Sequence, residues 1–176
     1  MRVLVTYGSS RGGTEGLARM VADDLRDCGL DVELLPPKRA RDISGYDAVV
    51  VGGALYAFRW HRVARRFVRR HATALRQRPT YFFSSGPLDE SASNNDLAPV
   101  PGVKSLMEQT GARGHATFGG RLSPDAKGFP ASAMSKKLSG DWRDAAQVKR
   151  WALRIAQELI DESGSAEPVS HKGIGQ

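Results

Sequence analysis

The sequence predicts an α/β protein built on an open, doubly wound parallel sheet of five strands with helices on both faces. Short apolar runs alternate along the chain with longer segments in which apolar residues recur at helical spacing. A turn rich in glycine and serine, residues 8–14, follows the first apolar run directly. The length of 176 residues suits one domain of ordinary size.

Each strand is expected at a short apolar or β-branched run, and each helix where apolar residues fall on one stripe. Leu17, Val21 and Leu25 form such a stripe before Gly29, which is a plausible helix stop. The expected strands are residues 2–7, 31–35, 47–52, 80–84 and 115–118, and the later helices are residues 61–77, 100–110 and 144–160.

Two segments lie outside this alternation. Residues 120–142 are rich in Gly, Pro, Ser and Lys and are expected to form a long loop, which at this length is more often functional than idle. Residues 163–176 are polar and are expected to be a disordered tail. A single domain over residues 1–162 is therefore expected.

The positive charge is concentrated in one stretch of the chain. Lys and Arg number 26 against 19 Asp and Glu, which gives a formal net charge of +7. Residues 59–78 hold eight arginines and no acid, and without them 18 basic residues face 19 acidic ones. This distribution argues against a histone-like protein that coats nucleic acid with its whole surface.

Composition and the N-terminal pattern favour a cytoplasmic protein. No apolar run approaches the roughly 18 residues needed to span a bilayer. The N-terminus enters a strand pattern at once, with no cleavage site of the secretory kind. The single Cys28 excludes an internal disulfide and cannot make a multi-cysteine metal site.

The turn after the first strand has the composition of an anion site. It leads into a helix N-terminus, where backbone N–H groups and the helix dipole attract phosphate. It lacks the Gly-Lys-Ser/Thr ending of nucleotide-hydrolysing loops and the spacing of a dinucleotide site, so a monophosphate fits it best. The alternative is a simple strand-to-helix turn capped by Thr14. The candidate phosphate-binding residues are Ser9, Ser10, Arg11, Gly12, Gly13 and Thr14.

Two further loops follow strands that end at the same edge of an open sheet, where such folds bind their ligands. The loop after the third strand carries aromatic residues that would stack on a flat ring, with packing over the sheet as the alternative for each. The loop after the fourth strand offers hydroxyl and backbone groups. The candidates are Ala54, Leu55, Tyr56, Phe58 and Trp60 in the first loop, and Ser84, Ser85, Gly86 and Pro87 in the second.

Together these loops resemble those of flavodoxins. The turn YGSSRGGTE is similar to the flavodoxin phosphate loop, with Gly13 where an Asn is usual and Arg11 where a small or hydroxyl residue is usual. The segments DAVVVGGALYAFRWHR, YFFSSGPL, GDWRD and WALRIAQEL look more specifically like the flavodoxin-domain proteins related to menaquinone-dependent protoporphyrinogen oxidase. The resemblance covers about residues 1–160. It implies a flavodoxin-like fold with FMN as cofactor and its phosphate in the first turn.

The resemblance implies an FMN-dependent oxidoreductase, in which the flavin itself performs the hydride or electron transfer. Quinone-linked oxidation of a porphyrinogen or another organic substrate is one such reaction. No aromatic residue occurs between Ser84 and Val103, so one flavin face is expected to be open, as suits an enzyme. The alternatives are a flavodoxin-type electron carrier, a flavodoxin-fold protein with altered or lost FMN binding, and a basic interaction module. The histidines show no metal-ligand spacing; they are His61, His71, His115 and His171.

The arginine-rich segment predicts an amphipathic helix with one apolar and one basic face. His71 falls in the apolar arc and is expected to be packed rather than catalytic. A solvated surface is the plain interpretation of the basic face. The functional alternatives are an anionic membrane surface, an anionic substrate or acidic partner, and nucleic acid, which is less favoured because the aromatic residues lie outside the arginine stripe. The basic face consists of Arg62, Arg65, Arg66, Arg69, Arg70 and Arg76.

Overall fold

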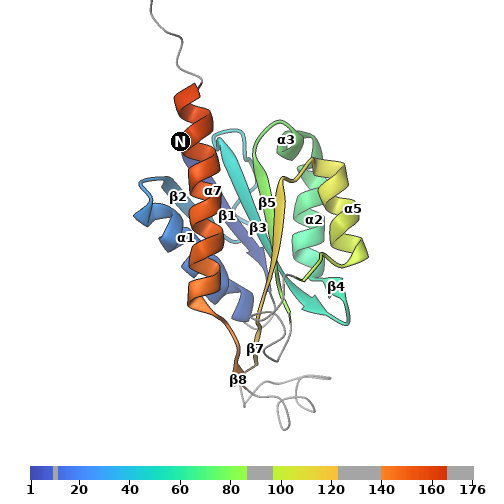
Figure 1. Cartoon of the computed structure of the whole chain (residues 1–176). Helices are drawn as coiled ribbons and strands as arrows, with labels where there is room; N and C mark the ends of the chain where they lie inside the picture. The colour runs from blue at the N-terminus through green and yellow to red at the C-terminus, as the bar shows by residue number, and fades with distance from the viewer. Residues whose placement is uncertain (10–11, 87–96, 123–139, 166–176) are drawn as a thin grey trace, which may run out of the picture.

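A parallel sheet forms the centre of the protein (Figure 1), for which a computed structural model describes residues 1–9, 12–86, 97–122 and 140–165. In this part of the chain, five parallel strands lie in the order β2-β1-β3-β5-β6. The predicted five-stranded, doubly wound sheet is thereby confirmed. The strands are β1 (Arg2–Gly8), β2 (Asp31–Leu35), β3 (Ala48–Tyr56), β5 (Thr80–Ser85) and β6 (Gly114–Phe118), and a short β4 (Arg59–Trp60) pairs antiparallel with the end of β3.

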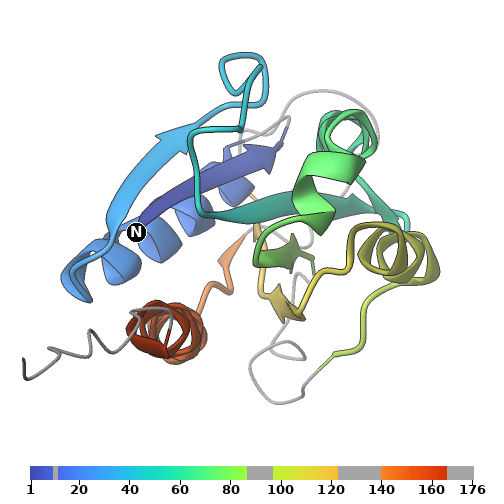
Figure 2. The same ribbon diagram turned by 90° about the horizontal axis from the view of Figure 1, so that it is seen from above.

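Helices cover both faces of this sheet (Figure 2). One face packs against α1 and α7, and the other against α2, α3 and α5. The expected stripe of α1 is buried, since Leu17, Val21 and Leu25 are each fully inaccessible to solvent. The helices are α1 (Gly13–Asp27), α2 (Arg62–Arg70), α3 (Ala72–Arg76), α5 (Pro101–Thr110) and α7 (Ala145–Ser165).

The connection between β2 and β3, residues 36–47, contains no helix. It begins at Pro36-Pro37, and its Ile43 and Tyr46 are buried in the core on the side of α2. Arg78 fastens this connection, because its guanidinium donates to the carbonyl oxygens of Ile43 and Tyr46. A loop therefore covers part of the sheet where a helix would otherwise lie.

The single helix predicted over residues 61–77 is wrong, because His71 divides it into α2 and α3. His71 has φ −105° and ψ 14°, which ends α2, and its carbonyl oxygen then accepts from the N–H of Leu75 in α3. Its ring packs on Phe67 with 4.7 Å between ring centroids. With the break in place, Phe67 and Leu75 are both buried against the sheet.

The long loop predicted at residues 120–142 also needs correction at its two ends. Arg121–Leu122 forms β7 and Gly140–Asp141 forms β8, and these two strands pair antiparallel. Residues 123–139 lie outside the described residues. α7 continues to Ser165, beyond the expected start of the tail at residue 163, and residues 166–176 are likewise outside the description.

Among the described residues, no helix combines the length and apolar character that crossing a membrane requires.

Candidate functional site

The carboxyl ends of β1, β3 and β5 lie side by side at one edge of the sheet. Gly8 pairs with Gly53, and Gly53 pairs with Ser84, so the three chain segments leave the sheet at the same level. Adjacent strands are about 4.8 Å apart. The loops that follow β1, β3 and β5 are therefore brought together, as the sequence predicts.

The turn after β1 delivers the N-terminus of α1 to this edge. Gly12 precedes the helix with φ 75°, a left-handed conformation that favours glycine. The described residues supply no side-chain cap for α1, so the first N–H groups of the helix remain available to an anion. Of the other predicted residues in this turn, Ser9 is half-buried, Gly13 is buried, and Ser10 and Arg11 lie outside the described residues.

Thr14 is the best-defined polar group of the turn. It lies in the first turn of α1 and is 1% exposed. Its Oγ1 has no hydrogen-bond partner among the described residues. A buried hydroxyl without a partner is costly, and a ligand oxygen would satisfy it. The alternative role of Thr14 as the helix cap is not observed, because Gly12 occupies that position.

The loop after β3 is a tight hairpin that projects past the end of β1. Ala54 is buried, Leu55 is half-buried, and Tyr56 is 37% exposed. Tyr56 makes an edge-on ring contact with His61, at 6.0 Å between centroids. These residues reach the same edge of the sheet as the turn after β1.

The prediction that Trp60 stacks on a flat ligand needs correction. The side chain is 2% exposed and packs on Phe82, with ring centroids 5.2 Å apart. Pairing of Leu55 with Trp60 in the hairpin directs the indole into the core on the α2 side. The interpretation that this aromatic residue packs over the sheet is the one that the structure supports.

The loop after β5 presents backbone more than hydroxyl groups. The hydroxyl of Ser84 is 2.9 Å from Nε2 of His115 and the residue is 1% exposed, so it lies inside the protein and not at the edge. Ser85 is also buried, at 7%. Gly86 lies against the side chain of Leu55, which brings the second and third loops into contact. Pro87 lies outside the described residues.

A segment that the sequence reasoning did not include in the site lies beside the N-terminus of α1. The guanidinium of Arg143 packs over Gly16 and forms a bidentate ion pair with Asp141, with 2.7 Å from its Nε to one carboxylate oxygen. This ion pair holds the pKa of Asp141 below its usual range. The N–H of Trp142 also donates to the carbonyl oxygen of Gly120, at 3.0 Å. The sequence run GDWRD, residues 140–144, marks this segment. Residue spacing alone could not show that the segment lies beside α1.

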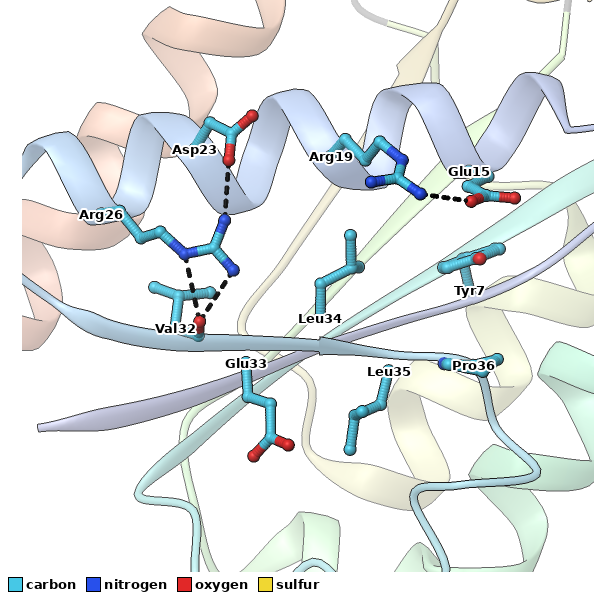
Figure 3. A pocket seen from close by; sticks show the side chains of 10 residues that line it. All are labelled: Tyr7, Glu15, Arg19, Asp23, Arg26, Val32, Glu33, Leu34, Leu35 and Pro36. Carbon is cyan, nitrogen blue, oxygen red and sulfur yellow. Dashed lines mark hydrogen bonds and ion pairs between the residues drawn. The ribbon is translucent and has the colours of Figure 1, made fainter.

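A groove of about 590 Å³ lies elsewhere, between α1 and the edge strand β2 (Figure 3). Its polar side chains bond to one another and to the backbone. Arg19 pairs with Glu15 and Arg26 with Asp23, and Arg26 also donates to the carbonyl oxygen of Val32 at the strand edge. None of the predicted cofactor residues lines it, although Tyr7 and Glu15 of its lining flank the turn after β1.

The strand order and the phosphate-type turn define the class of protein. In doubly wound sheets of this order, ligands bind at the carboxyl edge beside the first and third strands. The features gathered at this edge are the uncapped N-terminus of α1 and the starts of the loops that follow β3 and β5. The structure is that of a doubly wound α/β protein with a candidate anion site at the carboxyl edge of its sheet.

The chain belongs to the flavodoxin domain family, whose model matches residues 4–137. It is 28% identical over 86 residues to a protoporphyrinogen IX dehydrogenase [quinone] of Escherichia coli strain K12, and this match covers 48% of each chain. The matched region thus spans about half the length of that relative.

Solved structures agree with this assignment at the level of the fold. A flavodoxin from the domain Archaea is similar with a TM-score of 0.61 and 16% identity, over 91% of this chain and 99% of that one. The rubredoxin oxygen:oxidoreductase of Desulfovibrio gigas has a TM-score of 0.61 and 20% identity, over 92% of this chain and 36% of that one. The flavodoxin-like fold expected from the sequence is confirmed.

Proposed function

We propose that this protein is an FMN-dependent oxidoreductase that binds the cofactor at the carboxyl edge of the sheet. The observation that carries the proposal is the buried Oγ1 of Thr14, which has no partner in the described part of the chain and lies at an uncapped helix N-terminus. A phosphate monoester would accept hydrogen bonds from this hydroxyl and from the first N–H groups of α1. FMN carries such a phosphate, so the residues present fit this cofactor.

The chain's own residues bind and orient the cofactor. Gly12, Gly13 and Thr14 would hold the phosphate, while the hairpin after β3 and the turn at Gly86 would lie along the ring system. Contact between Leu55 and Gly86 keeps these two loops together. FMN, when bound, supplies the one- and two-electron redox chemistry.

Oxidation of a porphyrinogen with a quinone as acceptor is the specific reaction that we propose. It is supported by the similarity to the E. coli dehydrogenase, whose name states both the porphyrinogen and the quinone. The match covers 86 residues, which is about half of this chain and half of that relative. The substrate therefore needs its own test.

The cofactor is tested by titrating FMN into flavin-free protein and following the quenching of flavin fluorescence. We expect saturable binding that Thr14→Val weakens about 10- to 100-fold, because a hydrogen bond to a charged group is lost. Thr73→Val, at an exposed threonine of α3, is the matched control and should bind as the wild type does. Absence of binding to the wild type, or equal affinity in Thr14→Val, would overturn the proposal.

The substrate is tested separately with the FMN-loaded protein, protoporphyrinogen IX and a quinone under anaerobic conditions. Formation of protoporphyrin together with quinol is the expected result. A loaded protein that turns over neither compound would refute the porphyrinogen assignment and leave the cofactor assignment standing.

A further inference from the structure

We propose that the β3–β4 hairpin and the arginine face of α2 form a docking surface for an anionic lipid membrane. The arginine face is the set Arg62, Arg65, Arg66, Arg69 and Arg70. Arg62, Arg66, Arg69 and Arg70 are exposed and Arg65 is half-buried, and all five lie outside the candidate cofactor site. The hairpin is shared with that site, because it would also lie along the cofactor ring.

The arginine face lacks acidic partners. The sequence contains no Asp or Glu between Asp47 and Asp89. Within residues 1–9, 12–86, 97–122 and 140–165, none of these five arginines forms an ion pair. Elsewhere in the described residues some arginines form ion pairs, as Arg113 does with Glu162, and others such as Arg150 and Arg154 do not. What distinguishes α2 is the concentration of five arginines within nine residues without an acid, and an anionic partner would relieve their mutual repulsion.

Two neighbouring arginines in the same stretch have a different role. Arg76 donates to the carbonyl oxygen of Gln109 at 2.6 Å, and Arg78 donates to the backbone of residues 43, 46 and 74. These two side chains hold elements together. They are excluded from the docking surface, although Arg76 falls on the basic face predicted from the sequence.

The position of the charges also disfavours a purely structural role. Acidic residues are stabilising in the first turn of a helix, because the helix dipole is positive there. The first turn of α2 contains none, and begins instead with Arg62. A negatively charged surface would interact favourably with both the dipole and the guanidinium groups.

The hairpin adds an apolar group to this basic surface. Phe58 is 84% exposed, which is the largest exposed fraction among the large hydrophobic side chains of the described residues. It occupies the two-residue loop with Ala57, and both have positive φ, 59° and 46°. Residues other than glycine adopt this conformation only when the surroundings enforce it, and such strain is concentrated at functional positions.

Contacts on both sides of the hairpin loop enforce this conformation. Leu55 pairs with Trp60, the indole of Trp60 is buried, and Tyr56 contacts the ring of His61, which caps α2. The phenyl ring of Phe58 is thus held out into solvent, four residues before Arg62. An exposed aromatic group this close in the chain to a basic helix face would combine apolar burial with attraction to anionic lipid, the two contributions to interfacial binding.

A lipid bilayer fits this combination better than nucleic acid does. Anionic headgroups match the arginines, and the interfacial region accepts an aromatic ring. A duplex would use the arginines alone and leave the phenyl ring of Phe58 in water. An acidic protein would also be recognised through its charge, but its binding would not require lipid.

The test is sedimentation of the whole protein with vesicles, both flavin-free and FMN-loaded. We expect binding to phosphatidylcholine vesicles that contain about 30% phosphatidylglycerol, weakening as salt rises, and little binding to phosphatidylcholine alone. The loss caused by removing arginines of α2 should be the same with and without FMN, because these side chains lie outside the candidate cofactor site. No sedimentation at low salt would overturn the proposal.

Two variants separate the contributions. Combined Arg66→Gln, Arg69→Gln and Arg70→Gln should lower partitioning roughly 100-fold, from about fivefold for each arginine. Lys149→Gln, Arg150→Gln and Arg154→Gln remove the same charge from exposed residues of α7 on the opposite side of the sheet and should have far less effect. Equal losses in the two triple variants would show that only net charge matters and would refute a specific surface.

The apolar contribution is tested by Phe58→Asn, because asparagine tolerates positive φ and should preserve the hairpin. Partitioning should fall about tenfold, and Phe58→Trp should retain it. A short DNA duplex serves as competitor. Displacement of the protein from vesicles by DNA, with binding unaffected by Phe58→Asn, would assign the surface to nucleic acid instead.

Discussion

Gly8, at the end of β1, lies directly against the backbone of Ala64 in α2. A Cβ at residue 8 would stand 2.6 Å from the Ala64 nitrogen and 2.9 Å from its Cβ. The strand that leads into the phosphate turn and the first turn of α2 are therefore in direct contact. No side chain fits between them.

We expect Gly8→Ala to destabilise the protein by about 1–3 kcal/mol, because the methyl group must displace main chain. It should also weaken FMN binding by shifting the turn after β1. Gly102→Ala is the control, since nothing lies near that exposed position of α5 and alanine favours helix. Urea unfolding of both variants measures the difference, and an unchanged free energy of unfolding in Gly8→Ala would contradict the packing described.

The Asp141–Arg143 ion pair should be coupled energetically. Because the Asp141 side chain is 45% exposed, solvent screens the pair, and a double-mutant cycle with alanine should give a coupling of about 1 kcal/mol. The pKa of Asp141 is lowered in the folded state, so this contribution is present above the ordinary pKa of 3.8 and is lost as the pH falls below it. A coupling that does not change between neutral and strongly acidic pH would count against the assignment.

Tyr81 should contribute to the docking of α7 on the sheet. Its hydroxyl donates to the carboxylate of Glu158 at 2.7 Å, and burial together with this bond raises the pKa of Tyr81 above its usual value. Tyr81→Phe should cost about 1 kcal/mol of unfolding free energy, measured by urea denaturation. Glu158→Gln keeps an acceptor for the hydroxyl and should cost less; the reverse order would show that the bond is not the source of the effect.

Stability should fall in mildly acidic solution because of His71. Burial, aided by Arg70, lowers the pKa of His71 below 6.5 in the folded protein, so the unfolded chain takes up the proton first as the pH falls. The stabilisation is complete above pH 6.5 and is lost as the pH falls through the lower, folded-state pKa.

Melting temperatures recorded from about pH 7.5 to pH 5.5 measure this effect. The decrease should be smaller in His71→Gln, with a remainder from His61, whose pKa is also lowered by burial. A variant with the same decrease as the wild type would exclude His71 as the cause.

The strands of the sheet could be predicted from the sequence because buried parallel strands have a strong local signal. Residues 48–51 are apolar throughout, and each is completely buried. The turn after β1 also has a local signal, since its glycines and hydroxyl residues are contiguous, and its binding of phosphate stays a prediction. The helix expected after Thr14 begins two residues earlier, at Gly13.

Features that depend on tertiary context could not be predicted. The hairpin loop at Ala57-Phe58 has no glycine or asparagine to indicate positive φ, so β4 and the inward direction of Trp60 had no local signal. Ser84 alternates onto the same face as Phe82, and only the paired register with β6 reveals that it meets His115. The break at His71 is also decided by packing, because residues 61–77 keep one apolar stripe throughout.

The hydrogen bond between Trp142 and Gly120 closes the base of the β7–β8 pair, which lies in the chain between β6 and α7. A segment inserted between β7 and β8 would therefore enter and leave the domain at one point. Doubling the length of such an insertion costs only about 0.6 kcal/mol in closure entropy. For protein engineering, this pair of short strands is a graft point where a binding peptide or a reporter domain can be inserted next to the cofactor edge without redesigning the fold.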